Sequence, residues 1–100
     1  MDTSTTPRVA IVTGAGTGIG RAAALALLKD GWQVVLAGRR PEPLAAVTAE
    51  SGAGSRALAV PTDVSDAASV QDLFAAAVAQ FGRVDLLFNN AGMSNPPGPF

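Results

Sequence analysis

The sequence of 100 residues contains no cysteine and no histidine. No disulfide framework and no thiolate metal site can therefore form, and a zinc ion has almost no ligand available. Tyrosine is absent as well, and the only lysine is Lys29. The longest apolar run, from Ala22 to Leu28, is far too short to span a membrane. These absences argue against a zinc centre and against a membrane partner.

Charge is scarce and nearly balanced, with seven basic and eight acidic residues. Only Arg39 and Arg40 are adjacent basic residues, so we expect no nucleic-acid partner. The 48% hydrophobic content predicts a single globular domain. Residues 1–7 are polar and lack both the basic start and the apolar stretch of a signal peptide. We therefore expect a disordered start and a cytoplasmic protein.

A glycine-rich segment from Thr13 to Gly20, Thr-Gly-Ala-Gly-Thr-Gly-Ile-Gly, is the main feature of the sequence. It separates the apolar, β-branched run 9–12 from the alanine- and leucine-rich run 21–28, which is the order of a strand, a turn and a helix. The free amides that begin such a helix favour an anionic diphosphate. No Lys-Ser or Lys-Thr pair follows, so a triphosphate-binding P-loop is disfavoured.

Three glycines of this segment have separate expected roles. Gly14 is placed to make the tight turn, and Gly18 to let the backbone approach a phosphate. Gly20 is placed where the helix packs closely against the strand. Their spacing, Gly-x-x-x-Gly-x-Gly, differs from the common dinucleotide fingerprint Gly-x-Gly-x-x-Gly.

The remaining chain alternates apolar runs typical of buried strands with helical patterns. We expect strands at 8–13, 32–38, 55–61 and 85–89, and helices at 17–30, at 42–51 and from Ser65 or Asp66 to Phe81. The last helix has apolar residues at helical spacing, namely Val70, Leu73, Phe74, Ala77, Val78 and Phe81. The alternation predicts a doubly wound α/β fold of Rossmann type, with a parallel sheet in the strand order 3-2-1-4.

The second expected strand is followed by Arg39 and Arg40, with no acidic residue before Glu42. In dinucleotide-binding folds an acid near this position holds the ribose 2′-hydroxyl of NAD, whereas an arginine accommodates the 2′-phosphate of NADP. The pair therefore predicts NADP as the cofactor, with NAD as the alternative. Two solvated arginines in a loop are the competing interpretation.

Two further strand ends carry polar residues. Asp63 and Val64 follow the third strand, and from spacing alone Asp63 is equally well interpreted as an acid near the next helix start. The sequence Asn89-Asn90-Ala91-Gly92 ends the fourth strand. Two amides beside small residues suit either the approach of a ligand or a plain turn.

Taken together, these motifs resemble the amino-terminal half of a classical short-chain dehydrogenase/reductase. The resemblance covers residues 8–100 and implies an NAD(P)-binding Rossmann domain that is incomplete at its C-terminus. It implies hydride transfer between NADP(H) and a small-molecule alcohol or carbonyl substrate. The residues it assigns to the cofactor are Gly14, Thr17, Gly18, Ile19 and Gly20 at the diphosphate, Arg39 with Arg40 at the adenosine ribose, Asp63 and Val64 at the adenine, and Asn90, Ala91 and Gly92 beside the riboses.

The family's catalytic serine and Tyr-x-x-x-Lys motif lie downstream of its Asn-Asn-Ala-Gly motif. This sequence has no tyrosine, Lys29 falls on the first expected helix, and Ser94 is too early to match the serine. We therefore assign no catalytic residue and expect the chain to be inactive alone. By resemblance, the full-length enzyme is expected to form a homo-oligomer.

Two alternatives to the enzyme are compatible with these residues. The first is a non-catalytic dinucleotide-binding module or a truncated product, and the absent Tyr-x-x-x-Lys motif motivates it. The second, a Rossmann-type methyltransferase, is disfavoured by Asn-Asn-Ala-Gly at the fourth strand end.

Without further strands, the run 86–88 is expected to leave an unpaired sheet edge and apolar faces, which predicts poor solubility.

Overall fold

Four parallel strands form one sheet in the computed structural model, which describes residues 7–90. Their order across the sheet is β3-β2-β1-β4, as the sequence predicts. The strands are β1 (Val9–Thr13), β2 (Gln33–Gly38), β3 (Ala57–Pro61) and β4 (Leu86–Phe88). Strand β1 pairs with β2 on one side and with β4 on the other, so the carboxyl ends of all four strands lie at the same edge.

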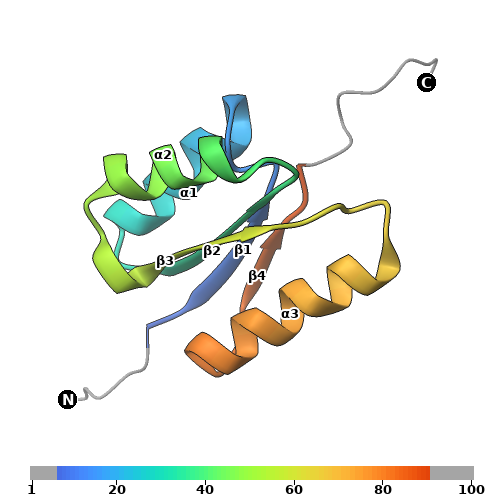
Figure 1. Cartoon of the computed structure of the whole chain (residues 1–100). Helices are drawn as coiled ribbons and strands as arrows, with labels where there is room; N and C mark the ends of the chain where they lie inside the picture. Colours follow the sequence, from blue (N-terminus) through green and yellow to red (C-terminus); the bar gives the residue numbers. More distant parts are fainter. Residues whose placement is uncertain (1–6, 91–100) are drawn as a thin grey trace, which may run out of the picture.

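Helices cover both faces of this sheet (Figure 1). Helix α1 (Gly18–Lys29) and helix α2 (Pro41–Ser51) lie on one face, and helix α3 (Ala67–Phe81) lies on the other. This placement is the right-handed crossover arrangement that consecutive parallel strands adopt. The unit is therefore a doubly wound α/β layer structure of Rossmann type. None of the helices in the described chain has the length and apolar character that a membrane crossing requires.

The apolar character of β1 follows from burial on both faces. Ala10 and Val12 belong to the core cluster beneath α1 and α2, whereas Ile11 belongs to the cluster beneath α3. Successive side chains of a strand point to opposite faces, so a strand covered on both sides is apolar at every position. All five residues of β1 are buried.

The helix ends are set by glycine and by an acidic cap. Gly31 has φ 94°, and its N–H donates to the Leu28 carbonyl at 3.1 Å while the Trp32 N–H donates to the Leu27 carbonyl at 3.0 Å. This is a Schellman motif with the predicted Gly31 at its left-handed position. Helix α3 begins after Asp66, whose carboxylate accepts from the Ala68 N–H at 3.1 Å. Asp66 rather than Ser65 is therefore the N-cap.

The third strand starts later than predicted. The expected range 55–61 loses its first two residues to a 3₁₀ turn, η1 (Gly54–Arg56). The Arg56 guanidinium donates to the Leu28 carbonyl at 3.0 Å and to the Trp32 carbonyl at 2.8 Å. A cation is favourable near the C-terminal end of α1, where the helix dipole is negative, and the two hydrogen bonds anchor Arg56 in the turn. The other element ends agree with the prediction to within two residues, and five of them coincide with it: Thr13, Gly38, Ser51, Pro61 and Phe81.

The uncovered side of the unit runs along β4 and α3. Strand β4 is an edge strand of the described sheet, as predicted, and Leu86 and Leu87 are 39% and 45% exposed. The predicted apolar stripe of α3 is only partly covered, because Leu73 and Ala77 are buried whereas Val78 is 53% exposed. Leu73 and Ala77 pack on side chains of β1 and β2, and Val78 lies outside that contact.

Candidate functional site

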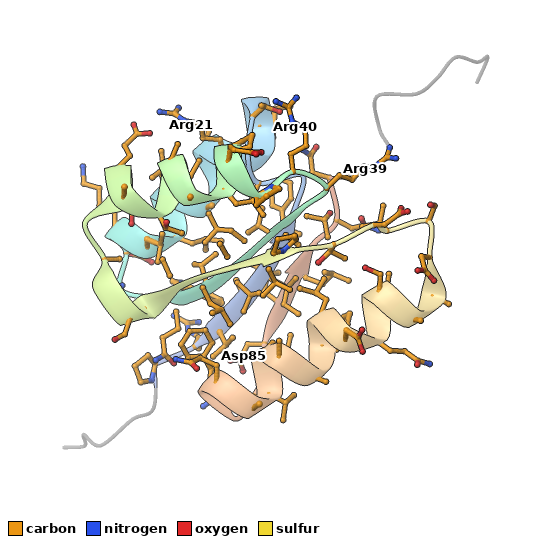
Figure 2. All side chains as sticks on the ribbon, viewed as in Figure 1. Arg21, Arg39, Arg40 and Asp85 are labelled. Atoms are coloured by element: carbon orange, nitrogen blue, oxygen red, sulfur yellow. The ribbon has the colours of Figure 1, made fainter. Side chains whose placement is uncertain are left out.

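The four predicted strand-end motifs meet at the carboxyl edge of the sheet. The glycine loop 14–20 follows β1, Arg39 and Arg40 follow β2, Asp63 follows β3, and Asn90 follows β4. Figure 2 shows both arginines at this edge and Asp85 at the opposite edge. In open parallel sheets the ligand lies at the carboxyl edge where the strand order reverses, which here is between β1 and β4.

The glycine loop has the backbone geometry that its residues predict. Gly14 and Gly18 are left-handed, with φ 65° and 58°. A Cβ atom added to Gly20 would lie 2.1 Å from the Gly14 carbonyl oxygen, so only glycine fits at position 20. Among residues 7–90, nothing lies within 4 Å of a Cβ added to Gly18, so this part of the chain leaves open space beside the residue. The loop is thus tight on the protein side and open on the outer side.

The start of α1 has the features of an anion site. Thr17 is the N-cap with an extended backbone, and its side chain makes no capping hydrogen bond in the described structure. The first turn contains no acidic side chain, and Ile19 is 67% exposed. The N–H groups at a helix start carry the positive end of the helix dipole, so these amides suit a diphosphate.

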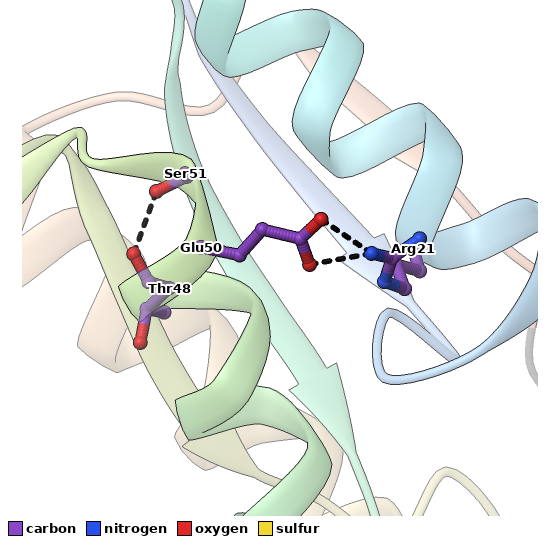
Figure 3. A network of polar contacts seen from close by, with 4 residues as sticks. All are labelled: Arg21, Thr48, Glu50 and Ser51. Carbon is purple, nitrogen blue, oxygen red and sulfur yellow. Dashed lines mark hydrogen bonds and ion pairs between the residues drawn. The ribbon is translucent and has the colours of Figure 1, made fainter.

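Arg21 lies close to the loop in sequence but is engaged elsewhere. One of its guanidinium nitrogens donates to both carboxylate oxygens of Glu50, which ties α1 to α2 (Figure 3). Near this pair, the Ser51 hydroxyl forms a hydrogen bond within α2, donating from Oγ to the Thr48 carbonyl at 2.7 Å. Both charged side chains of the pair are more than 40% exposed, so its contribution to stability is small. Its consequence is that Arg21 is occupied by Glu50.

Arg39 and Arg40 are exposed, and neither guanidinium group takes part in an ion pair or hydrogen bond found among residues 7–90. Arg40 is also the N-cap of α2, with an extended backbone. The two guanidinium groups therefore face solvent at the carboxyl edge (Figure 2). Cations in this state are available for an anionic group of a ligand.

Asp63 is not the cap of α3. Its Oδ1 accepts from the Ser65 N–H at 3.0 Å and from the Ser65 hydroxyl at 2.6 Å, while its own N–H donates to Ser69 Oγ at 2.9 Å. The two Ser65 hydrogen bonds lower the pKa of the Asp63 carboxyl, and the positive charge of Arg39 lowers it further. Asp63 is thus a fixed carboxylate, with Val64 exposed beside it.

Thr13 links β1 to the end of β4. Its hydroxyl oxygen accepts from the Asn90 N–H at 2.8 Å and lies 3.1 Å from Asn89 Oδ1, to which it donates. Thr13 belongs to the glycine motif, but its role in joining the two strand ends was not predicted from the sequence. The available signal was a lone hydroxyl at the end of an otherwise apolar, buried strand.

The Asn90 side chain lies against the glycine loop. Its Nδ2 is 3.0 Å from the position that a Cβ of Gly20 would occupy. The fourth strand end and the start of α1 are therefore in contact at the reversal point. The predicted residues Ala91 and Gly92 lie outside the described residues. Among residues 7–90, no group of three potential ligands is placed to hold a metal ion.

Comparisons with known proteins agree with this geometry. The family model described as short chain dehydrogenase matches residues 8–100. An oxidoreductase of Methylorubrum extorquens is 50% identical over 88 residues, which are 86% of this chain and 36% of the relative. This chain therefore spans little more than a third of that relative's length.

Two solved structures contain the same architecture with a nicotinamide cofactor bound. The 3-ketoacyl-(acyl-carrier-protein) reductase of Brucella melitensis, complexed with NADH, is 40% identical with a TM-score of 0.75, over 80% of this chain and 32% of that one. The C-domain of a bacterial malonyl-CoA reductase, with NADP, is 32% identical with a TM-score of 0.83, over 89% of this chain and 15% of that one.

Proposed function

Because the chain belongs to the short chain dehydrogenase family, we propose that it forms the dinucleotide-binding part of an oxidoreductase that transfers hydride between NADP(H) and an alcohol or carbonyl substrate. The observation that carries the proposal is the meeting of the glycine loop, Arg39, Asp63 and Asn90 at one sheet edge. The domain extends over 8–100 in this proposal, and the substrate is a small molecule.

The glycine loop binds the diphosphate in this proposal. The residues concerned are Gly14, Thr17, Gly18, Ile19 and Gly20. Left-handed backbone at Gly14 and Gly18 supports the role, since glycine takes this conformation without strain and has no Cβ to keep a phosphate away from the backbone. The absence of an acidic side chain in the first turn of α1 supports it as well, because a carboxylate there would repel a phosphate.

Arg39 and Arg40 bind the 2′-phosphate and thereby select NADP(H). Their exposure supports this assignment, whereas Arg21, which follows the glycine loop in the sequence, is paired with Glu50. The solved relatives contain NADH in one case and NADP in another, so both cofactors occur on this fold. Two charge-assisted hydrogen bonds of about 1.5–3 kcal/mol each favour the phosphorylated form by roughly tenfold or more after screening.

The other strand ends bind the remainder of the cofactor. Asp63 and Val64 contact the adenine, and Asn90, Ala91 and Gly92 lie beside the riboses. The Ser65 hydrogen bonds support the role of Asp63, because they hold its carboxylate in one orientation. The contact of Asn90 with Gly20 supports its position next to the diphosphate.

Bound NADPH supplies the hydride. The residues of this chain bind and orient the cofactor, and the sequence offers neither tyrosine nor histidine for proton transfer. In this proposal a serine and a Tyr-x-x-x-Lys motif, which residues 1–100 do not contain, would complete the catalytic site. In this proposal the full-length enzyme is a cytoplasmic homo-oligomer.

A non-catalytic dinucleotide-binding module is the second candidate, and the lack of a tyrosine favours it. Titration of the chain with NADPH, NADH and S-adenosylmethionine tests the binding function shared by both candidates. We expect binding of NADPH, weaker binding of NADH and none of S-adenosylmethionine. Binding of S-adenosylmethionine, with no binding of NADPH or NADH, would overturn the proposal. A coding sequence that continues into a serine and Tyr-x-x-x-Lys supports the enzyme, whereas a stop codon after Phe100 supports the module.

A further inference from the structure

The glycine loop touches the first turn of α2. A Cβ atom added to Gly16 would lie 2.7 Å from the Pro43 Cβ, 3.6 Å from its Cγ and 3.7 Å from its carbonyl carbon. Real Cβ contacts are essentially never shorter than 3.0 Å. The backbone of Gly16 is outside the left-handed region, so an alanine is compatible with its conformation and only the contact with Pro43 excludes a side chain.

Pro43 cannot move away by itself. Its Cβ belongs to a ring fused to the backbone of α2, so relief of a clash requires a shift of the helix. The next residue, Leu44, is fully buried, and a Cβ at Gly38 would lie 3.3 Å from its Cδ2. The first turn of α2 is therefore held on one side by the glycine loop and on the other by the end of β2.

The arginines of the cofactor edge are attached to this turn. Arg40 is the N-cap of α2, and Arg39 directly precedes it. A shift of the first turn of α2 away from Gly16 therefore carries the backbone of both arginines with it. The position of the Arg39–Arg40 pair relative to the glycine loop thus depends on the contact between Gly16 and Pro43.

We propose that the Gly16–Pro43 contact sets the separation between the diphosphate-binding loop and the 2′-phosphate-binding arginines, and that both are positioning residues for the choice of NADP(H) over NAD(H). This inference rests on the proposed function. Charge-assisted hydrogen bonds weaken steeply as their geometry departs from the optimum. NADH has no 2′-phosphate, so its binding is insensitive to the place of the arginines.

The test compares affinities for NADPH and NADH by calorimetric titration of the full chain at fixed moderate salt. The Gly16→Ala variant is expected to lower the preference for NADPH by about threefold or more, because displaced guanidinium groups lose hydrogen-bond strength. The double variant Gly16→Ala/Pro43→Gly removes the clashing Cβ and is expected to recover the preference. The single variant Pro43→Gly measures the effect of the helix change itself, and Ala46→Ser adds one heavy atom to the exposed surface of α2 as a matched control.

The outcomes separate this inference from the proposed function. A loosened loop weakens both cofactors equally, so an unchanged preference in Gly16→Ala, or a changed one that the double variant fails to recover, would overturn the inference alone. Tighter binding of NADH than of NADPH by the unaltered chain would overturn the proposed cofactor choice and the inference with it. If Gly16→Ala does not fold, as judged by circular dichroism, the double variant still decides: a folded double variant with the preference intact supports the contact, and an unfolded one contradicts it.

Discussion

Gly20 lies directly against the carbonyl oxygen of Gly14, so that a Cβ at position 20 would be 2.1 Å from that oxygen. The obstacle is backbone rather than a flexible side chain. The first turn of α1 and the residue that follows β1 are therefore too close for any side chain at position 20. This contact fixes where the free amides of α1 lie relative to the sheet edge.

Replacement of Gly20 by alanine is expected to destabilise the fold. The added methyl group has no free space, and overpacking of this kind costs roughly 1–3 kcal/mol. NADPH affinity is expected to fall as well, because α1 must move. Chemical denaturation and cofactor titration measure the two effects, with Ala22→Ser on the exposed surface of α1 as the control. Unchanged stability and affinity in Gly20→Ala would contradict the assigned contact.

Thr13→Val tests the link between β1 and the end of β4. The substitution keeps the shape of the side chain but removes the oxygen that accepts from the Asn90 N–H. A partly buried donor left without its acceptor costs about 1–3 kcal/mol. Thr13→Ser retains the hydroxyl and serves as the matched control. Equal unfolding free energies for the valine and serine variants would show that the hydroxyl is dispensable.

Asp85 is expected to make stability depend on pH in the acid range. Its Oδ2 accepts from the Val9 N–H at 2.8 Å and its Oδ1 pairs with Arg83 at 2.7 Å. The hydrogen bond from Arg83 and then that from Val9 lower the pKa of Asp85 below 3.8. Since the folded-state value is the lower one, the stabilisation is complete above the unfolded-state pKa and is lost as the pH falls through the folded-state pKa.

Asp85→Asn removes this titration. The difference in unfolding free energy between the unaltered chain and Asp85→Asn is expected to shrink as the pH is lowered from neutral to below 3.8. Asp72→Asn, on the exposed surface of α3, controls for the loss of one negative charge. A difference that stays constant with pH, measured by denaturation at several pH values, would refute the role of Asp85.

Arg39→Asp is expected to reverse the cofactor preference. An aspartate repels the 2′-phosphate and accepts from the 2′-hydroxyl, which favours NADH by roughly tenfold or more relative to the unaltered chain. Lys29→Asp makes the same change of charge at the far end of α1 and is expected to leave the preference unchanged. An unaltered ratio of NADPH to NADH affinity in Arg39→Asp would remove Arg39 from the site.

The sheet and its strand order were predictable from local pattern. The run 9–12 is apolar at every position because β1 is covered on both faces, and Gly31 marks the end of α1 because only glycine takes its left-handed conformation without strain. Which of the apolar residues of α3 are buried was not predictable. The helical spacing of its apolar residues carries no information on how far the sheet extends, so the exposure of Val78 had no signal in the sequence.

The candidate site was predictable as a set of strand ends but not as a set of contacts. From spacing alone Asp63 was equally well interpreted as an acid near the next helix start or as a ligand contact. Its hydrogen bonds with Ser65, and the capping of α3 by Asp66, became known only from the structure. The contact of Gly16 with Pro43 joins residues 27 positions apart through a helix packing that no local pattern encodes. The ligand contacts themselves remain predictions, including those of Ala91 and Gly92.

The central claim is that NADPH binds at the carboxyl edge of the sheet. Backbone amide shifts, recorded by nuclear magnetic resonance while NADPH is added to the full chain, test it most directly. We predict the largest saturable changes at Gly18, Gly20, Arg39, Asp63 and Asn90. Largest changes instead at the opposite edge, around Trp32, Arg83 and Asp85, or no saturable change at all, would contradict the claim.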